Sequence, residues 1–386
     1  MLAATVLCYF TLYGPQPLLP YFAERYALTT ARAGLIVTVA MLPLTIGPVF
    51  AGMLLSAVRP HTLMGIALVL LAGATAVFLV APGYELILAA RMMQGLMFPV
   101  ILTAVTAQIA MTSTPESVAR RLGFYVASTI VGGFGGRLLA GASAAIGDWR
   151  LFFAAVGVSA LVLGVRSVVA GGETMAQPRS EPARRPVFRD AQRPTATQTR
   201  VFISVFLLFF VFSGTLNVLP FRTVSIARTS APWLSGVMYA GYLMGIVTSV
   251  WSYRIVRAVG GRVPVLRLAY LLMALSIALT LVGSIPVLFG SLFAVCGSMF
   301  LIHSVSTAAV NEDAPDREGA TNGLYIGSYY TGGVFGSYAA PVIYDALGWT
   351  ILILLSILVV ATAAALAITD AAGSRVVHYG ADRGSR

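Results

Sequence analysis

Long apolar runs, separated by short breaks rich in proline, glycine and charge, cover nearly the whole chain. Each run is long enough to cross the hydrocarbon core of a bilayer, which takes about 20 apolar residues in a helix. The runs form two sets of six. They fall at 2–22, 33–57, 62–81, 84–111, 121–146 and 150–170, then at 201–221, 233–256, 264–283, 286–310, 323–346 and 349–369. The pattern predicts an all-α integral membrane protein with twelve transmembrane helices.

The segment between the two sets has a different composition. Residues 171–200 are rich in proline, arginine, serine and threonine and have no apolar period, which is typical of a flexible linker. The tail, 370–386, is short and polar, and we expect it to be disordered. The predicted organisation is a six-helix bundle at 1–170, a linker at 171–200, a second six-helix bundle at 201–369, and the tail.

One stretch of the chain is written twice. Gly123–Trp149 reads GFYVASTIVGGFGGRLLAGASAAIGDW, and Gly323–Trp349 reads GLYIGSYYTGGVFGSYAAPVIYDALGW, an ungapped match at an offset of 323 − 123 = 200. The same offset relates Pro20 to Pro220. Spans 1–6 are therefore repeated as spans 7–12, which predicts two pseudo-symmetric bundles of the same orientation.

The matched positions include a row of small residues at a spacing of four. On a helix this row forms one ridge, a surface that lets two backbones approach closely inside a membrane. We expect the ridges of spans 5 and 11 to form sliding, gating contacts between the two halves. Their residues are Ser128, Gly132, Gly136 and Ala140, and Ser328, Gly332, Gly336 and Ala340.

Composition supports a lipid environment. Hydrophobic residues make up 58% of the chain and charged residues 10%, against about 25% charged residues in soluble domains. Mean hydropathy is +0.87. The two cysteines, Cys8 and Cys296, stand far apart in apolar runs, so we expect buried free thiols rather than a disulfide or metal site.

The net charge of +11 comes entirely from arginine, and its distribution predicts orientation. If the linker is cytosolic, eighteen arginines lie on that side, five on the other, and two within spans. Cytosolic loops are enriched in basic residues, so both termini are predicted to be cytosolic. This one-sided clustering also argues against a nucleic-acid partner.

Two motifs resemble those of a known family, the major facilitator superfamily. Arg91-Met-Met-Gln94-Gly95, in span 4, is similar to its R-x-x-Q-G signature. The glycine spacing of span 5, which starts at Gly123, is similar to the antiporter motif of the twelve-span drug:proton branch. That branch has proline where this chain has Arg137. The superfamily's signature between spans 2 and 3 is degraded, because Ser56 replaces an acid thought to lock the outward-facing state.

The resemblance implies a monomeric secondary transporter of a bacterial cytoplasmic (inner) membrane, working by alternating access, with no enzymatic activity and no cofactor. No Asp or Glu stands in the middle of a span, which favours neutral or anionic cargo. We expect proton-coupled efflux of a small metabolite or drug. An organic-anion uniporter or uptake symporter is an alternative, and a transporter-like membrane sensor is an alternative of another class. The partners expected are a small-molecule substrate, protons and the lipid bilayer.

Arg137 is the most informative candidate residue. A cation within a span costs at least ~2.5–3.5 kcal/mol, so it should face a cavity or an acid. It either contacts an anion in the central cavity, reaches the membrane interface, or makes a structural ion pair. The candidate acids for that pair are Glu24, Glu85 and Asp345.

The other candidates for substrate binding or coupling also carry alternatives. Arg91 lines the cavity by resemblance, with Gln94 one turn away, or pairs with Glu85 on the same helix. His303 is the one histidine within a span, and it either takes part in a proton step or packs between helices. By resemblance, spans 1, 4, 7 and 10 line the cavity. Its further candidate contacts are Tyr9, Tyr13, Gln16 and Asn217.

Overall fold

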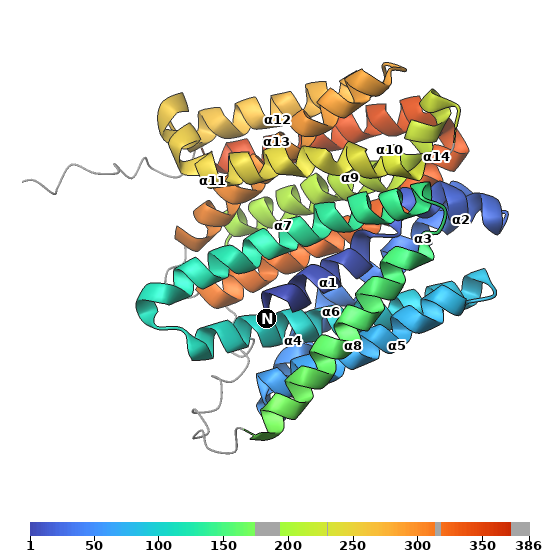
Figure 1. Cartoon of the computed structure of the whole chain (residues 1–386). Coiled ribbons are helices and arrows are strands. Elements are labelled where there is room, and N and C mark those ends of the chain that lie inside the picture. The colour runs from blue at the N-terminus through green and yellow to red at the C-terminus, as the bar shows by residue number, and fades with distance from the viewer. Residues whose placement is uncertain (174–193, 230, 313–317, 372–386) are drawn as a thin grey trace, which may run out of the picture.

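The computed structural model describes residues 1–173, 194–229, 231–312 and 318–371 (Figure 1). The first half consists of α1 (Leu2–Tyr13), the short 3-10 helix η1 (Gln16–Leu18), α2 (Leu19–Arg25), α3 (Thr30–Met41), α4 (Pro43–Ala57), α5 (Pro60–Val80), α6 (Tyr84–Thr112), α7 (Pro115–Ala145) and α8 (Arg150–Glu173). The second half consists of α9 (Ala196–Ala227), α10 (Pro232–Met238), the 3-10 helix η3 (Tyr239–Gly241), α11 (Tyr242–Val259), α12 (Arg262–Leu279), α13 (Ile285–Glu312) and α14 (Glu318–Ala371). The all-α prediction is confirmed.

These helices account for twelve crossings. Within the described residues, nine helices are long and apolar enough to span a membrane, or ten if the bent α3–α4 pair is one span. The apolar part of α14, Gly323–Ile368, has 46 residues, about 69 Å at 1.5 Å per residue, and it is interrupted at Gly348, so it crosses twice. The first crossing, Leu2–Arg25, is divided between α1, η1 and α2. These two corrections bring ten crossings to twelve.

Proline and glycine explain where several helices begin and end. Pro43 and Pro60 occupy the first turns of α4 and α5, where the missing N–H is not needed. Gly260 ends α11 in the left-handed conformation, with φ +90°. Gly348 adopts φ +78° between spans 11 and 12. Five predicted spans therefore differ in detail: spans 1, 2 and 8 are broken, and spans 11 and 12 join in one bent helix.

Helices extend into both ends of the predicted linker, residues 171–200. Helix α8 continues to Glu173, and α9 begins at Ala196 behind a capping box in which Thr195 and Gln198 satisfy each other's backbone N–H groups. Helical residues thus occupy both ends of the 171–200 segment. Residues 174–193 and the tail beyond Ala371 lie outside the described residues.

The small-residue ridges pack within each half, not between the halves. A Cβ added to Gly132 would come within 2.6 Å of Tyr9 in α1, and one added to Gly136 within 2.8 Å of Phe10. In the second half, a Cβ on Gly336 would overlap the carbonyl oxygen of Phe210 in α9, the residue 200 positions after Phe10. The prediction that these ridges form sliding contacts between the halves is therefore wrong, because the ridges contact helices of their own half. A row of small residues indicates close approach of two helices, and here the approaching helix is span 1 or span 7 of the same bundle.

Among the described residues, two other pairs of helices make the most extensive contacts between the halves. Helix α7 meets α10, where a Cβ on Gly141 would lie 2.6 Å from the carbonyl oxygen of Pro232. Helix α3 meets α14, where a Cβ on Gly34 would lie 3.0 Å from Pro341. Gly141 and Pro341 are 200 positions apart, so these are the same contact repeated by pseudo-symmetry. We call them the α7–α10 seam and the α3–α14 seam.

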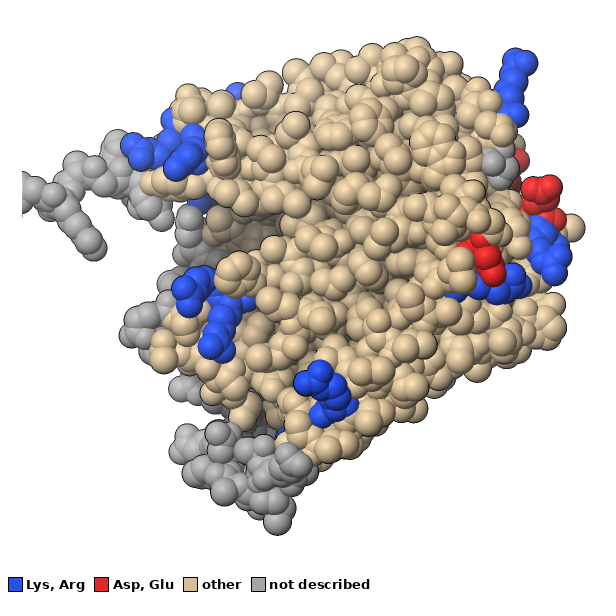
Figure 2. Space-filling model, viewed as in Figure 1, with Lys and Arg blue, Asp and Glu red and all other residues tan. Residues whose placement is uncertain are grey.

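Both seams lie away from the linker. We call the end where α8 ends and α9 begins the linker end, and the end carrying Gly147 and Gly348 the far end. Hydrogen bonds between the halves, among described residues, run from the mid-height pair Tyr9–Tyr330 to Asp345 at the far end. Figure 2 shows arginines gathered mainly at the linker end, arginines and acids together at the far end, and few charges on the sides between. The halves are joined from mid-height to the far end.

Candidate functional site

Arg137, in α7, is the centre of the candidate site. Its side chain is 1% exposed. The Nε donates to the Gln16 amide oxygen at 2.7 Å, and one terminal nitrogen donates to the Gly133 carbonyl at 2.8 Å. The other terminal nitrogen contacts the Tyr242 hydroxyl at 3.4 Å. None of the described acids pairs with it, so the predicted ion pair with Glu24, Glu85 or Asp345 is not formed.

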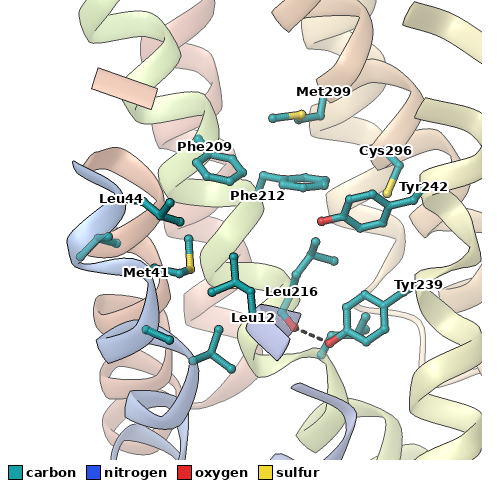
Figure 3. Packing of buried hydrophobic residues seen from close by; sticks show 14 of the residues in the cluster. Leu12, Met41, Leu44, Phe209, Phe212, Leu216, Tyr239, Tyr242, Cys296 and Met299 are labelled. Carbon is teal, nitrogen blue, oxygen red and sulfur yellow. Dashed lines mark hydrogen bonds between the residues drawn. The ribbon is translucent and has the colours of Figure 1, made fainter. Parts of the chain in front are cut away.

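Three tyrosine rings surround the guanidinium of Arg137. Its central carbon lies 4.0 Å from the ring centre of Tyr13, 4.6 Å from Tyr239 and 4.8 Å from Tyr242. Contacts within about 6 Å are favourable cation–π interactions, and they strengthen when water is excluded. We call these rings the tyrosine cage. Figure 3 shows Tyr239, from η3, and Tyr242, from the start of α11, pointing towards Phe212 and Leu216 of α9.

The cage is assembled from both halves at the break in span 8. Tyr13 comes from the end of α1, whereas Tyr239 opens η3 and Tyr242 opens α11. The Tyr239 hydroxyl donates to the carbonyl of Leu216 at 2.9 Å, which fixes its ring. The sequence analysis did not predict a role for Tyr239 or Tyr242 of span 8. The pattern that could have indicated one is two tyrosines three positions apart, which lie on one face of a helix.

A chain of polar contacts continues from Arg137 to the other seam. The Gln16 amide nitrogen donates to Asn217 at 3.4 Å, and the Asn217 amide nitrogen donates to the carbonyls of Ser337, at 2.8 Å, and Gly34, at 3.3 Å. The Ser337 hydroxyl lies 2.9 Å from that of Thr38. Three predicted contacts, Tyr13, Gln16 and Asn217, are thus brought together with Arg137.

Arg91 occupies a separate place, inside the first half. It is fully buried, and its nitrogens donate to the carbonyls of Thr11, Leu12 and Ile36 at 2.6–2.7 Å and to the Gln94 amide oxygen at 2.7 Å. The Gln94 amide nitrogen in turn donates to Thr75 at 3.1 Å. All four contacts are short and directed at fixed groups.

The break in span 1 explains these contacts. Pro15 has no N–H to offer the carbonyl of Thr11, four residues earlier, and the last carbonyls of any helix lack partners. Arg91 supplies donors to Thr11 and Leu12 and so completes the end of α1. At the same offset in the second half, residue 215 is threonine, α9 runs unbroken, and residue 291 is serine. The predicted pair between Arg91 and Glu85 is not formed, since Glu85 contacts Arg32 at 3.3 Å.

His303, in α13, faces α14. The Tyr325 hydroxyl donates to the His303 carbonyl at 3.2 Å and lies 3.0 Å from its Nδ1. The ring also lies 4.8 Å from Tyr329, which stacks on Phe209 at 3.7 Å. His303 is therefore apart from the tyrosine cage.

Asp345 has a role that the sequence reading did not assign. It belongs to α14, yet its two carboxylate oxygens accept from the backbone N–H groups of Thr30, at 3.2 Å, and Ala31, at 2.7 Å. These are the first residues of α3, so an acid of the second half caps a helix of the first. A carboxylate is favoured at a helix N-terminus by the unpaired N–H groups and the helix dipole.

The comparisons with known proteins agree with this architecture. The family model described as Major Facilitator Superfamily matches residues 1–325. The chain belongs to the major facilitator superfamily. It is accordingly a secondary transporter of small molecules and a multi-pass membrane protein, not an enzyme.

Individual relatives are distant. The inner membrane transport protein YnfM of Escherichia coli is 24% identical over 360 residues, covering 90% of this chain and 84% of the relative. An uncharacterized transporter of Buchnera aphidicola (Schizaphis graminum) is 23% identical, covering 85% and 80%. In solved structures, a bacterial homologue of the human lysosomal transporter Spinster, inward-facing and occupied, superposes with a TM-score of 0.75 at 14% identity, covering 96% and 95%. The human organic anion transporter MFSD10 gives a TM-score of 0.63 at 19% identity, covering 93% and 97%. The two solved structures support the fold alone.

Proposed function

We propose that this transporter exports a small organic anion, or a neutral compound with a strong hydrogen-bond acceptor, in exchange for protons. The observation that carries the proposal is Arg137, a buried cation held between the halves by amide, carbonyl and hydroxyl oxygens and tyrosine rings. Burial of an uncompensated charge within a membrane costs at least ~2.5–3.5 kcal/mol. An anionic substrate offsets that cost and gains charge-assisted hydrogen bonds from the guanidinium.

The division of the cage between the halves gives a mechanism. In the observed state, Tyr239 and Tyr242 cover Arg137 from the second half. When the halves part at the far end, these rings withdraw with their own half, and Tyr13, Gln16 and Arg137 stay on the first. The guanidinium is then offered to a substrate in place of the rings. Closing the seams reverses the exchange, so substrate and tyrosines compete for one cation.

The direction of opening follows from the arginine distribution. The linker end carries most of the arginines, and cytosolic loops are the basic ones. We therefore place the linker end and both termini in the cytosol, in a bacterial cytoplasmic (inner) membrane. With the seams closed at the far end, the observed state is then the inward-facing one. The antiporter-like spacing that begins at Gly123 supports the drug:proton branch and efflux as the direction.

Proton exchange needs a group that gains and loses a proton between the two states. His303 fits this role because an imidazole gains and loses a proton near neutral pH, and Tyr325 contacts one of its two ring nitrogens, Nδ1, at 3.0 Å. Asparagine places an amide nitrogen close to the Nδ1 position, but that nitrogen does not titrate. His303→Asn should therefore keep substrate exchange in proteoliposomes and lose the response to an imposed pH gradient. A gradient that never changes wild-type flux makes the protein a uniporter, and lost exchange in the variant makes His303 structural.

Binding at Arg137 is tested with a panel of small anions, neutral compounds and cations scored by thermal shift, since a ligand of the folded state raises its melting temperature. The expected hits are anions, and the shift should vanish in Arg137→Gln while persisting in Arg120→Gln, a control arginine exposed at the linker end. Hits confined to cations would contradict the proposal. Ligand binding without flux in liposomes would favour the membrane-sensor alternative.

A further inference from the structure

A groove on the lipid-facing side of the second half lies outside the candidate site. Helices α11, α12 and α13 enclose about 380 Å³, and the lining is almost wholly apolar. Its lower part, near the linker end, is formed by Ile255, Val265 and Leu301, and its upper part by Met244, Leu272 and Gly290. Thr248 and Ser298, on the wall, already donate to carbonyls of α11 and α13. The groove is therefore an apolar surface, and the two hydroxyls on its wall are already hydrogen-bonded to the backbone.

Charge gathers at the linker end of this groove. The end of α11, the turn after it and the start of α12, together called the α11–α12 turn, carry four arginines in fourteen residues: Arg254, Arg257, Arg262 and Arg267. Arg254 adjoins the lining residue Ile255, and Arg262 is one helical turn before the lining residue Val265. No acidic residue occurs from Ala191 to Asn311, so α11, α12 and the part of α13 that lines the groove carry no negative charge, and α13 ends at Glu312. The positive charge at the mouth of the groove therefore comes from these arginines.

Aromatic residues place this mouth at the level of lipid headgroups. The Arg254 guanidinium lies 5.6 Å from the ring centre of Trp251, and that of Arg257 lies 5.9 Å from Tyr253. Both rings are more than half exposed, 53% and 60%. Exposed tryptophan and tyrosine are typical of membrane interfaces, where the ring meets lipid and the polar edge meets water. The arginines therefore stand at phosphate depth, and the groove continues from there into the hydrocarbon core.

We propose that this groove binds an anionic phospholipid, with an acyl chain between α11, α12 and α13 and the headgroup phosphate on the arginines of the α11–α12 turn. Basic pockets between transmembrane helices at the membrane surface hold anionic headgroups, and each basic residue near an anionic surface strengthens the attraction. A second groove, of about 310 Å³ between α5 and α8, is lined by six aliphatic residues. Among the described residues it adjoins Arg166 but no comparable run of arginines, so the proposal concerns the first groove.

The headgroup half of the proposal is tested by adding phosphatidylglycerol or phosphatidylcholine with matched acyl chains to the detergent-solubilised protein. Phosphatidylglycerol should raise the melting temperature at lower concentrations than phosphatidylcholine. Replacing Arg254 and Arg257 together by Gln should raise the half-saturating concentration about tenfold or more, from the loss of two interfacial charges. The control is the double change of Arg120 and Arg121 to Gln, which removes equal charge from the linker end of the first half. Equal weakening in both double variants would overturn the proposal.

The acyl-chain half is tested with Gly290, which lines the groove and has no atom within 4 Å of an added Cβ. Gly290→Phe should fill the groove and abolish the phosphatidylglycerol shift, while Gly73→Phe, a change at an equally open glycine of α5, should not. Inorganic phosphate is the third arm. If phosphate alone reproduces the shift, or if Gly290→Phe leaves it intact, the site binds a soluble anion on the arginines and the proposal fails.

Discussion

The two seams between the halves are one contact repeated by pseudo-symmetry, yet they are filled with different chemistry. In the α7–α10 seam, Arg137 meets tyrosine rings and a hydroxyl at 3.4 Å. In the α3–α14 seam, the residue 200 positions later is Ser337, which meets Thr38 at 2.9 Å, and Asp345 caps α3 at 2.7 Å. Across one seam, a cation meets the other half through ring faces and one long hydroxyl contact. Across the other, two hydroxyls and a helix end with its capping carboxylate make shorter hydrogen bonds.

The difference separates two tasks that a rocking transporter needs. A seam with short, saturated hydrogen bonds sets how stable the closed state is. A seam built around a cation whose partners are rings, amides and one long hydroxyl contact keeps a binding group available when those partners withdraw. We therefore assign cargo recognition to the α7–α10 seam, whereas closure alone is assigned to the α3–α14 seam, although both seams must close, and this assignment is open to test at each position.

The largest expected effect is on Arg137. Arg137→Gln should reduce transport in proteoliposomes by about tenfold or more, because a charge-assisted hydrogen bond to the substrate is lost. Arg137→Lys should recover only part of the rate, since an ammonium cannot contact Gln16, Gly133 and three rings at once. Expression and melting temperature serve as the control for folding. Full transport by Arg137→Gln would remove the functional distinction between the seams.

The next effect concerns the close approach at Gly141. An added Cβ would lie 2.6 Å from a backbone oxygen of α10, so Gly141→Ala must separate the seam, at a cost typical of overpacking, about 1–3 kcal/mol. The closed population should fall roughly tenfold. Spin labels at Gly83 and Gly283, open positions at the far end of each half and 200 residues apart, measure this as a distance distribution. Gly123→Ala, where an added Cβ meets nothing within 4 Å, is the matched control.

A smaller effect is expected at Asp345. Asp345→Ala removes the cap on α3, which is worth about 0.5–2 kcal/mol, and should shift the same spin-label distances towards the open state several-fold. Asp345→Asn can still accept from one backbone N–H group, so its shift should be intermediate. Substrate affinity measured by thermal shift should change little in either variant. A larger loss of affinity here than in Arg137→Gln would reverse the assignment of the two seams.

The sequence predicted the architecture well because its signals are local. Apolar runs depend only on neighbouring positions, and each copy of the 200-residue repeat is a local pattern that can be matched to the other, so together they predicted twelve crossings in two halves. Proline explains the break in span 1 at Pro15, but the prediction treated that run as one helix. The partner of Arg91 was also within reach, because a proline-broken helix end needs donors and Gln94 follows one turn later. The unpaired carbonyls at that helix end favour a structural role for Arg91 over a contact in the cavity.

The features that the sequence did not predict concern which helices pack against each other. The ridge of Gly132 and Gly136 correctly indicated close packing, but a single helix does not state its neighbour, and the neighbour proved to be α1 of the same half. The cage around Arg137 depends on the break in span 8 at Tyr239–Tyr242, which contains no proline to signal it. Asp345 capping α3 joins residues more than 300 positions apart. Such contacts arise from tertiary packing and have no local sequence pattern.

The smallest effect, and the sharpest comparison, is at Ser337. Ser337→Ala removes one hydroxyl contact with Thr38, whose own hydroxyl still donates to the Gly34 carbonyl at 3.2 Å, so no buried group loses its last partner. Its expected cost is about 0.5–1.5 kcal/mol, the net value of one neutral hydrogen bond. Transport should stay within a few-fold of wild type, and the spin-label distances should shift less than in Asp345→Ala. Because Ser337 and Arg137 occupy equivalent positions, equal loss of transport in the two variants would mean that closure, not the charge, makes this position important. Retained transport in Ser337→Ala beside lost transport in Arg137→Gln would place the cargo-binding function in the one half that carries the arginine.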